Sequence, residues 1–467
     1  MTRAVVVGSG PNGLAAAVTL ARAGVEVTVL EAADRIGGGT RSSELTLPGL
    51  LHDDCSAFHP TAAASPFLRS LELERYGLRW RWAPVELAHP LDGGRAALLT
   101  RSLPETAQRL GPDGRAWRRL FGPLVRGFDT LAGEILGPVV HAPRHPVALA
   151  RFGVNALLPA TVLARRFSTV EARALFAGVA AHVMRPLRSP LTASIGLVLT
   201  AAAHAYGWPV AEGGSQSIAN ALAALLREHG GTIETGAPVT SLPKADIVML
   251  DVAPAAAAGI IGDRLPARVA RAYRRYRHGP GVVKLDLAVE GGIPWADERC
   301  RQAGTVHLGG DLHEIVETER AVAAGRPPER PFVLVGQQYV ADPTRSSGDV
   351  HPVWTYAHVP AGYTGDATQA ILAQIERFAP GVRARIRGRF VRTPADMTAY
   401  NANYVGGDIA TGANDPWQIV MRPRLGFDPY RTGVDGVYLC SAATPPGAGA
   451  HGMCGFHAAR SALRAHR

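Results

Sequence analysis

The chain has 467 residues, of which 47% are hydrophobic and 19% charged, and its 49 basic and 39 acidic side chains give a formal net charge of +10. This composition is typical of a globular protein with enough apolar residues for a large core, and the length fits two or three domains. It excludes a disordered chain, a collagen and a coiled coil. Four cysteines, with no Cys-x-x-Cys pair, exclude a disulfide scaffold and argue against a metal site.

The positive charge comes almost entirely from arginine, because Lys244 and Lys284 are the only lysines. The arginines are scattered, whereas a nucleic-acid binder usually gathers them on one element with interleaved aromatic residues. Together with the many Ala, Gly and Pro residues, they indicate the codon bias of a GC-rich genome. We therefore expect no nucleic-acid partner.

Apolar runs in the sequence are short. No signal-like stretch follows Met1, and the longest apolar run, Ala193–Tyr206, is interrupted by Gly196, Thr200 and His204. A membrane-spanning helix needs about 20 consecutive apolar residues. We expect a cytoplasmic protein with reduced thiols.

The first 31 residues have the pattern of a βαβ unit. A strand is expected at Ala4–Val7, a glycine-rich turn at Gly8–Gly13, a helix at Leu14–Ala23 and a second strand at Val25–Leu30, which ends at Glu31. This order of elements around Gly-x-Gly-x-x-Gly is the fingerprint of a dinucleotide-binding site.

The spacing of these residues explains the chemistry. Gly8 permits the tight turn, Gly10 lets the backbone approach a pyrophosphate, and Gly13 lets the helix pack closely on the strand. The helix N-terminus offers free N–H groups to the phosphates. Glu31 is placed to accept the hydroxyl groups of the ribose.

The fingerprint alone does not distinguish NAD from FAD. A second glycine cluster, Gly37–Gly39, follows the ribose acid, and an NAD dehydrogenase has no need of it. Near the C-terminus, a turn and a strand within Gly436–Thr444, a glycine-rich loop at Pro445–Gly455 and a helix at Phe456–Arg464 form a second motif. A helix N-terminus there suits the electron-rich pyrimidine end of a reduced flavin. A second dinucleotide site is rejected, because the chain after this loop is too short for another strand and its ribose acid.

With these motifs the sequence resembles the phytoene desaturase-like flavoproteins, which are distantly similar to amine oxidases. Within that group it looks like the bacterial relatives of pyridine nucleotide-disulfide oxidoreductase domain-containing protein 2. Two further stretches, His52–Pro60 and Ala402–Asp408, are similar to this bacterial set.

The resemblance implies an α/β fold. A discontinuous Rossmann-like FAD-binding domain of the glutathione reductase type 2 class would carry an inserted α+β substrate domain. The expected FAD-binding parts are residues 1–75, 208–280 and 406–467, and the expected substrate-domain parts are the mostly helical 76–207 and then 281–405.

The central segment fits this division. Trp208–Gln216 precedes a helix expected at Ser217–His229, and a strand at Thr232–Thr235 follows. In relatives the residue matching Val239 meets adenine through its backbone. Relatives usually insert a strand meander after that residue, but here the next strand, at Ala245–Leu250, follows almost at once. This argues against a typical carotenoid desaturase and favours the bacterial subgroup.

The motifs and the resemblance together predict non-covalent FAD and the residues that bind it. These are Gly8, Gly10, Pro11, Asn12, Gly13, Glu31, Ala32, Gly38, Gly39, Thr40, Arg41, Ser56, Ala57, Val239, Ser441, Ala442, His451, Gly452, Met453 and Cys454.

Two residues are candidates for catalysis. Lys284 lies in an alternating strand, where amine oxidase relatives have a lysine that holds a water near flavin N5, and its charge would favour negative charge on the flavin. The alternative is a surface lysine on an edge strand. His59 follows a segment that relatives place along the flavin ring, and it is a candidate acid–base or a structural histidine. Candidates for the substrate cavity, with core packing as the alternative, are His204, Tyr206, Trp208 and Tyr404.

The function expected from this reasoning is FAD-dependent dehydrogenation (desaturation) of an apolar or medium-sized organic molecule, with hydride passing to flavin N5. Oxygen, a quinone or another acceptor would reoxidise the flavin. A redox-neutral flavin isomerase, an amine oxidase and a non-enzymatic binding protein remain alternatives. The stretch Arg151–Phe167 is either a basic amphipathic segment in peripheral contact with a membrane or a solvated helix.

Overall fold

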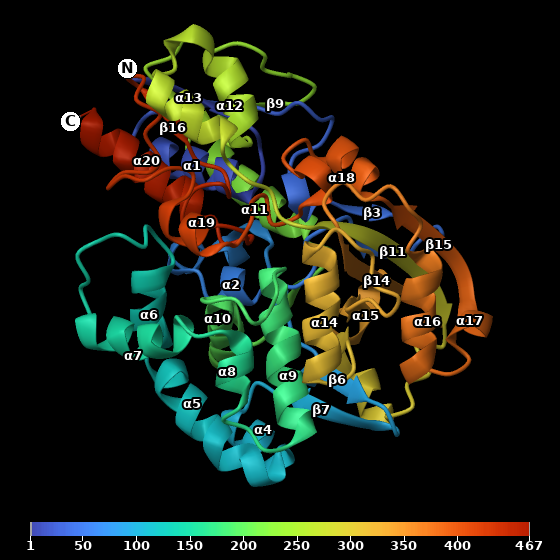
Figure 1. Ribbon diagram of the computed structural model, residues 1–467. Coiled ribbons are helices and arrows are strands. Elements are labelled where there is room, and N and C mark those ends of the chain that lie inside the picture. Colours follow the sequence, from blue (N-terminus) through green and yellow to red (C-terminus); the bar gives the residue numbers. More distant parts are fainter. Residues whose placement is uncertain (1, 467) are drawn as a thin grey trace.

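The computed structural model describes residues 2–466, and two β-sheets organise it (Figure 1). The first sheet has five parallel strands in the order β16-β10-β1-β2-β9. They come from the beginning, the middle and the end of the chain: β1 (Arg3–Val7), β2 (Glu26–Leu30), β9 (Thr232–Glu234), β10 (Ile247–Leu250) and β16 (Val437–Leu439). The predicted Rossmann-like α/β fold is confirmed, whereas the exact domain boundaries stay a prediction.

Helices cover both faces of this sheet (Figure 1). Successive residues of a strand point to opposite faces, so Val6 packs in the core under one set of helices and Val7 in the core under the other. The first set is α1 (Pro11–Ala21), α11 (Gln216–Glu228) and α20 (Met453–Ala465), and the second is α12 (Pro254–Ile261) and α13 (Ala267–Arg274).

Two of these helices begin earlier than the sequence pattern predicted. Helix α1 begins at Pro11 instead of Leu14, because proline suits the first helical position, where no N–H partner is needed. Helix α20 begins at Met453 instead of Phe456, directly after Gly452. Between β9 and β10 the described chain contains no strand, as expected for the bacterial subgroup.

The second sheet is mixed, with the order β15-β11-β14-β13-β12-β6-β7, and only β6 and β12 pair in parallel. One face packs on α16 (Thr368–Phe378) and α17 (Val382–Arg385). The strands are β6 (Val85–Leu91), β7 (Arg95–Leu99), β11 (Gly281–Glu290), β12 (Ala303–Leu308), β13 (Val333–Gly336), β14 (Val350–Val359) and β15 (Ile386–Arg392). Two small ribbons pair β3 (Ser42–Glu44) with β4 (Leu51–Asp53) and β5 (Trp80–Arg81) with β8 (Val210–Ala211).

Most of the remaining helices form a layer beside the second sheet (Figure 1). They are α4 (Leu103–Arg109), α5 (Gly114–Arg126), α6 (Phe128–Ile135), α7 (Pro146–Ala156), α8 (Ala160–Ala164), α9 (Val170–Ala180), α10 (Thr192–Tyr206) and α14 (Leu312–Ala323). Shorter ones are α2 (Pro60–Ala63), α3 (Pro66–Arg69), α15 (Gln338–Ala341), α18 (Pro394–Tyr400) and α19 (Pro416–Met421), with 3-10 turns at Gly38–Thr40, Leu73–Tyr76, Gly111–Asp113, Ala181–Val183, Gly262–Arg264, Glu298–Gln302, Pro343–Arg345 and Val405–Gly407. Among the described residues, no helix has the length and apolar character needed to cross a bilayer.

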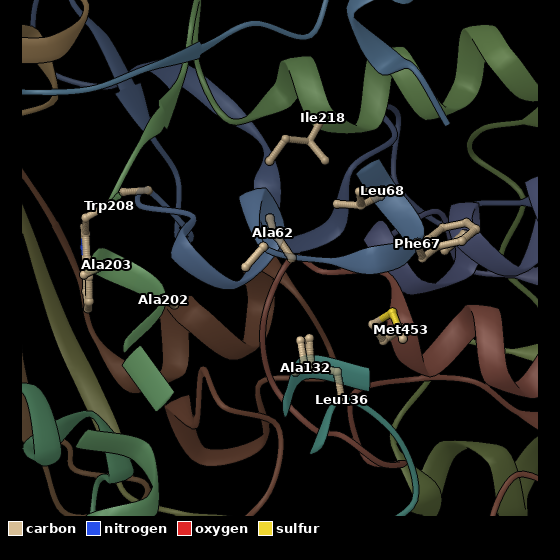
Figure 2. Close-up of a cluster of buried hydrophobic side chains, with 14 of the residues drawn as sticks. Ala62, Phe67, Leu68, Ala132, Leu136, Ala202, Ala203, Trp208, Ile218 and Met453 are labelled. Atoms are coloured by element: carbon tan, nitrogen blue, oxygen red, sulfur yellow. The ribbon is translucent and has the colours of Figure 1, made fainter. Parts of the chain in front are cut away.

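One continuous core joins the first sheet's helices to this layer. Figure 2 shows Phe67 of α3, Ala132 of α6, Ala203 of α10, Ile218 of α11 and Met453 of α20 in the same apolar cluster. Residues far apart in sequence are therefore held in one packed unit.

A buried ion network joins the two small ribbons to the segment that precedes β14. Arg345 has no exposed surface, and its guanidinium lies 2.6 Å from Asp53 and 3.1 Å from Asp342 while it donates to the backbone oxygen of Ala211 at 2.7 Å. Asp53 also accepts hydrogen bonds from Ser42 Oγ and from the backbone N–H of Ser215, at 2.8 and 2.7 Å. Burial alone would raise the pKa of Asp53, but Arg345 and these hydrogen bonds outweigh it and lower the pKa.

We expect Arg345→Met to lower the free energy of unfolding by about 3–5 kcal/mol, because it leaves Asp53 charged and buried without its partner. Urea unfolding measures this loss. The matched control is Arg387→Met, which removes the exposed ion pair with Glu290 and should change stability little. Equal effects of the two substitutions would contradict the role given to the network.

Candidate functional site

The glycine-rich turn after β1 opens onto the N-terminus of α1. A Cβ atom on Gly13 would lie 2.1 Å from the backbone oxygen of Gly8, so only glycine allows the helix to approach the strand this closely. Helix α1 starts after Gly10, a residue that has no side chain with which to cap the helix. Among the described residues, Asn12 Oδ1 is buried without a hydrogen-bond partner. A phosphate group accepts from the backbone N–H groups of such a helix start, whereas Asn12 Oδ1 is itself an acceptor and needs a donor such as a hydroxyl group.

Glu31 stands at the end of β2 beside this turn. One carboxylate oxygen accepts from the N–H of Ala33 at 2.9 Å and lies 3.3 Å from Arg41 Nη2. The other accepts from the N–H of Ser9 at 2.9 Å and from the Ser9 hydroxyl. These contacts fix the carboxylate at the edge of the sheet, where the sequence pattern places the ribose acid.

A second helix N-terminus meets the first. A Cβ atom on Gly455 would lie 1.8 Å from the backbone oxygen of Asn12, and one on Gly452 would lie 3.0 Å from Ala15 Cβ. The first turns of α20 and α1 are therefore in direct contact. Two positive helix ends side by side create a region that favours an anionic ligand.

The second glycine cluster, Gly37–Gly39, packs against the glycine-rich turn after β1. The N–H of Gly37 donates to the backbone oxygen of Ser9 at 3.0 Å, and a Cβ atom on Gly38 would lie 3.0 Å from Gly10 Cα. The N–H of Ser56 then donates to the backbone oxygen of Gly39 at 2.9 Å. This row of backbone contacts leads from the phosphate turn through the glycine cluster to Ser56.

Lys284 lies on the face of the second sheet that meets the Ser56 end of this row, because it shares that face with Trp354, which bonds Cys55. It is buried on β11, which is flanked by β14 and β15, so it is not a surface lysine on an edge strand. Burial raises the pKa of the neighbouring Cys55 thiol to about 11, although the Lys284 charge acts to lower it. The backbone oxygen of Cys55 accepts from Trp354 Nε1 at 3.1 Å, which ties this segment to the second sheet.

Tyr404 and its neighbour Tyr400 pack against the second glycine cluster, Gly37–Gly39. A Cβ atom on Gly39 would lie 1.9 Å from the Tyr404 hydroxyl oxygen, and Tyr400, whose ring centre is 6.3 Å from that of Tyr404, donates its hydroxyl to the backbone oxygen of Gly38 at 2.7 Å. Of the predicted cavity-lining residues, Tyr404 is therefore the one that contacts the glycine cluster.

His59 is buried and held by neutral groups. Its Nε2 lies 2.8 Å from Ser215 Oγ, and its ring centre is 5.7 Å from that of Trp80. Burial lowers the pKa of His59 to about 4, so the imidazole is neutral at pH 7. His451 is similar, since burial lowers its pKa to about 4 while its Nδ1 accepts from the N–H of Met453 at 3.1 Å.

The other predicted cavity-lining residues lie elsewhere. His204 accepts from Trp117 Nε1 at 3.1 Å within an aromatic cluster of the helical layer, which agrees with the core-packing alternative. The Tyr206 hydroxyl bonds Asp129 and Arg69 near the surface. Trp208 is buried, with its ring centre 5.7 Å from that of His182.

The remaining predicted cofactor residues fall at the same edge of the first sheet. Ser441 and Ala442 follow β16, Val239 packs against the core of α12 and α13, and Cys454 Sγ lies 3.4 Å from the backbone oxygen of Thr444. Their contacts with a cofactor stay predictions.

Sequence reasoning missed Asp251. It follows β10 directly, and its carboxylate accepts from the N–H of Gly13 at 2.8 Å. Burial and the charge of Glu31 raise the pKa of Asp251 to about 7, although the Gly13 hydrogen bond opposes them. Its position after a strand next to β1 was the available signal, because the carboxyl ends of parallel strands share one edge.

We expect Asp251→Asn to be more stable than the wild type at pH 8 and to lose this advantage towards pH 4. Because the folded-state pKa is raised, the folded protein binds the proton more tightly, and wild-type stability falls as pH rises from about 4 to about 7. Thermal unfolding of the apoprotein across this range measures the difference. An advantage that does not change with pH would contradict the prediction.

With the geometry in place, comparison with known proteins identifies similar chains. Residues 6–71 match the NAD(P)-binding Rossmann-like domain model. The chain is 24% identical to pyridine nucleotide-disulfide oxidoreductase domain-containing protein 2 of Rattus norvegicus, with 99% of this chain and 93% of the relative covered. It is 26% identical to the phytoene dehydrogenase of Streptomyces griseus (95% and 91% covered) and 32% identical to the hydroxyneurosporene desaturase of Cereibacter sphaeroides over about half of each chain (51% and 50%).

Solved structures of amine oxidases share the fold. Putrescine oxidase bound to putrescine superposes with a TM-score of 0.62 at 19% identity, with 99% of this chain and 98% of that chain covered. Cyclohexylamine oxidase from Brevibacterium oxydans gives a TM-score of 0.57 at 16% identity over the whole of both chains. The predicted resemblance to phytoene desaturase-like proteins is confirmed, and the names of these relatives agree with the predicted oxidoreductase class.

Proposed function

We propose that the protein is an FAD-dependent oxidoreductase that dehydrogenates a small organic molecule. The observation that carries this proposal is the row of contacts from Glu31 past two helix N-termini and the glycine cluster to Ser56 and Cys55. Trp354, which bonds the backbone oxygen of Cys55, shares one face of the second sheet with Lys284. Proteins hold an extended dinucleotide by a ribose acid at one end and a phosphate site in the middle, and a charge near the flavin tunes its electronics. The order of Glu31, the helix N-termini and Lys284 supports these roles.

Each part of the row has a task when FAD is bound. Glu31 accepts hydrogen bonds from the ribose, the N–H groups at the start of α1 bind the pyrophosphate, and the N-terminus of α20 stabilises negative charge on the pyrimidine end of the flavin. The flavin supplies an acceptor for two electrons and a hydrogen. Lys284 would stabilise the negative charge that develops on the reduced ring.

The proposed substrate is apolar. The face of the second sheet that carries Lys284 also carries Trp354, Tyr356 and Phe332, and all of them are buried in the core shared with the helical layer. Aromatic side chains bind apolar molecules through a large contact area. Oxygen, a quinone or another soluble acceptor would then take the electrons from the flavin.

Amine oxidation is the second candidate function. It requires a pair of aromatic rings facing the flavin, and the Tyr400–Tyr404 pair beside the glycine cluster is a candidate for it. The fold likeness to putrescine oxidase is compatible with this reaction. A redox-neutral isomerase would use the same site with flavin that stays reduced.

We expect purified protein, reconstituted with FAD if necessary, to carry flavin absorbance that is lost when a member of a panel of apolar alkenes, phytoene included, is added without oxygen and kept when putrescine is added. Gly13→Ala should not bind FAD, because its Cβ would collide with the backbone of Gly8. Gly259→Ala is the matched control, since its Cβ would meet nothing within 4 Å. Bleaching by putrescine alone would replace desaturation with amine oxidation, and an inability to bind FAD would overturn the proposal.

We also propose that α7 and α8 bring the protein into peripheral contact with a membrane. The predicted segment Arg151–Phe167 forms parts of two helices, interrupted before Ala160, with exposed apolar side chains. Val147, Val154 and Leu157 are 63%, 69% and 62% exposed, and Arg151 is exposed among them. Apolar side chains next to arginine favour an anionic bilayer surface.

Replacing Val147, Val154 and Leu157 together by serine should reduce co-sedimentation with phosphatidylglycerol vesicles without changing FAD content. The apolar contact would be lost, while the flavin site lies on other elements. The exposed residue Trp417, changed to serine, serves as a control outside α7 and α8. Unchanged sedimentation of the triple variant would contradict the proposed contact.

A further inference from the structure

A line of buried polar side chains leads from Lys284 away from the glycine cluster. Lys284 and Asp286 are two residues apart on β11, so they share one face of the strand, and the Lys284 ammonium bonds directly to Asp286 Oδ2. The other oxygen of Asp286 lies 3.5 Å from Nδ1 of His52, which comes from β4. All three side chains are buried.

The line continues towards the surface. Nε2 of His52 lies 2.8 Å from Oγ1 of Thr46, a partly exposed residue in the loop between β3 and β4. His52 thus has one ring nitrogen directed at a buried carboxylate and the other at a hydroxyl group near solvent. An imidazole with a different neighbour at each nitrogen can take up a proton on one side and release it on the other.

The central gap in this line has an unusual feature. Asp286 Oδ1 and His52 Nδ1 are both buried without a hydrogen-bond partner, and they face each other. Leaving two buried polar atoms unpaired has a cost that a purely structural contact would avoid by closing the gap. A proton placed between them would satisfy both atoms.

We propose that Lys284, Asp286, His52 and Thr46 form a route for protons between the flavin site and solvent. The proposal rests on the proposed function. In a dehydrogenation two C–H bonds break and one C=C bond forms: one hydrogen leaves with its electron pair and reduces FAD, and the other leaves as a proton. Lys284 passes one proton to Asp286 and accepts the substrate's proton on the freed lone pair. Asp286 passes its proton to His52 Nδ1, and His52 releases one from Nε2 towards Thr46 and water.

The charge of Asp286 supports proton transfer from Lys284 towards His52. Burial alone would raise the pKa of Asp286, but the Lys284 charge and His52 outweigh it and lower the pKa. Asp286 is therefore an ionised carboxylate, which is the form that accepts a proton. A merely structural Asp286 would need only to neutralise Lys284, and neither His52 nor Thr46 would contribute.

Reduction of bound FAD by dithionite tests the route without knowledge of the substrate. Dithionite supplies electrons but no hydride, so the proton that the reduced flavin takes up must come from solvent. Stopped-flow absorbance follows the flavin, and phenol red in weak buffer follows the net proton change. The protons that dithionite oxidation releases, in fixed ratio to the electrons transferred, are subtracted to give proton uptake. We expect His52→Gln, which keeps a polar side chain of similar size, to slow proton uptake at least about tenfold.

The control variant is His351→Gln. His351 is also partly buried, and its Nδ1 lies 2.8 Å from Ser346 Oγ, but it belongs to another cluster and should leave proton uptake unchanged. If His52→Gln does not fold, Thr46→Val tests the outer end of the route, with Thr46→Ser expected to restore the wild-type rate. Imidazole added to His52→Ala should restore part of the rate.

The outcomes separate the two proposals. Protein that cannot bind FAD would overturn the proposed function. Protein that binds FAD and is reduced by dithionite, but in which proton uptake is as fast in His52→Gln and Thr46→Val as in the wild type, would overturn the proton route and leave the proposed function intact.

Discussion

The contact on which the site most depends is the buried ion network of Arg345. One guanidinium group pairs with both Asp53 and Asp342 and also donates to the backbone oxygen of Ala211. These partners belong to three segments that are far apart in sequence. Because a buried charge without a partner is strongly unfavourable, the three segments must come together for any of them to be buried. Arg345 therefore fixes the β3–β4 and β5–β8 ribbons relative to the segment that precedes β14.

Asp53, the main partner of Arg345, lies within a few residues of the proposed flavin site. Asp53 immediately precedes the stretch in which Ser56 bonds Gly39 and Cys55 bonds Trp354. Asp53 also binds the N–H of Ser215, whose hydroxyl contacts His59. A shift of Asp53 would thus move the glycine cluster, His59 and the neighbourhood of Lys284 together. The network has a structural task, but its effect is to align the residues that would act on the cofactor.

The parts of the site that depend on local pattern could be predicted from the sequence. The βαβ unit, the role of Gly13 and the position of Glu31 follow from spacing, because strand, turn and helix are adjacent in the chain. The meeting of α20 with α1 was implied only by the resemblance to known flavoproteins. The structure adds its physical reason, which is the close approach that Gly455 allows to the backbone of Asn12.

The parts that depend on tertiary contacts could not be predicted. Nothing in the sequence distinguishes Arg345 from the other arginines, and His52 meets Asp286 only because β4 packs on the second sheet. Asp286 itself lies two residues from Lys284 in an alternating strand, so its shared face was visible in the pattern. For His204 the sequence left both the substrate cavity and core packing open, because its partner Trp117 comes from a helix that the sequence pattern did not place beside it.

The central claim is that one extended site joins Glu31 to Lys284, and a crystal structure of the protein with FAD tests it most directly. The account predicts electron density for FAD with the adenosine ribose on Glu31, the pyrophosphate at the start of α1 and the flavin ring beside Lys284. Density that places the flavin ring away from Lys284, or a nucleotide bound without contact to Glu31, would contradict it.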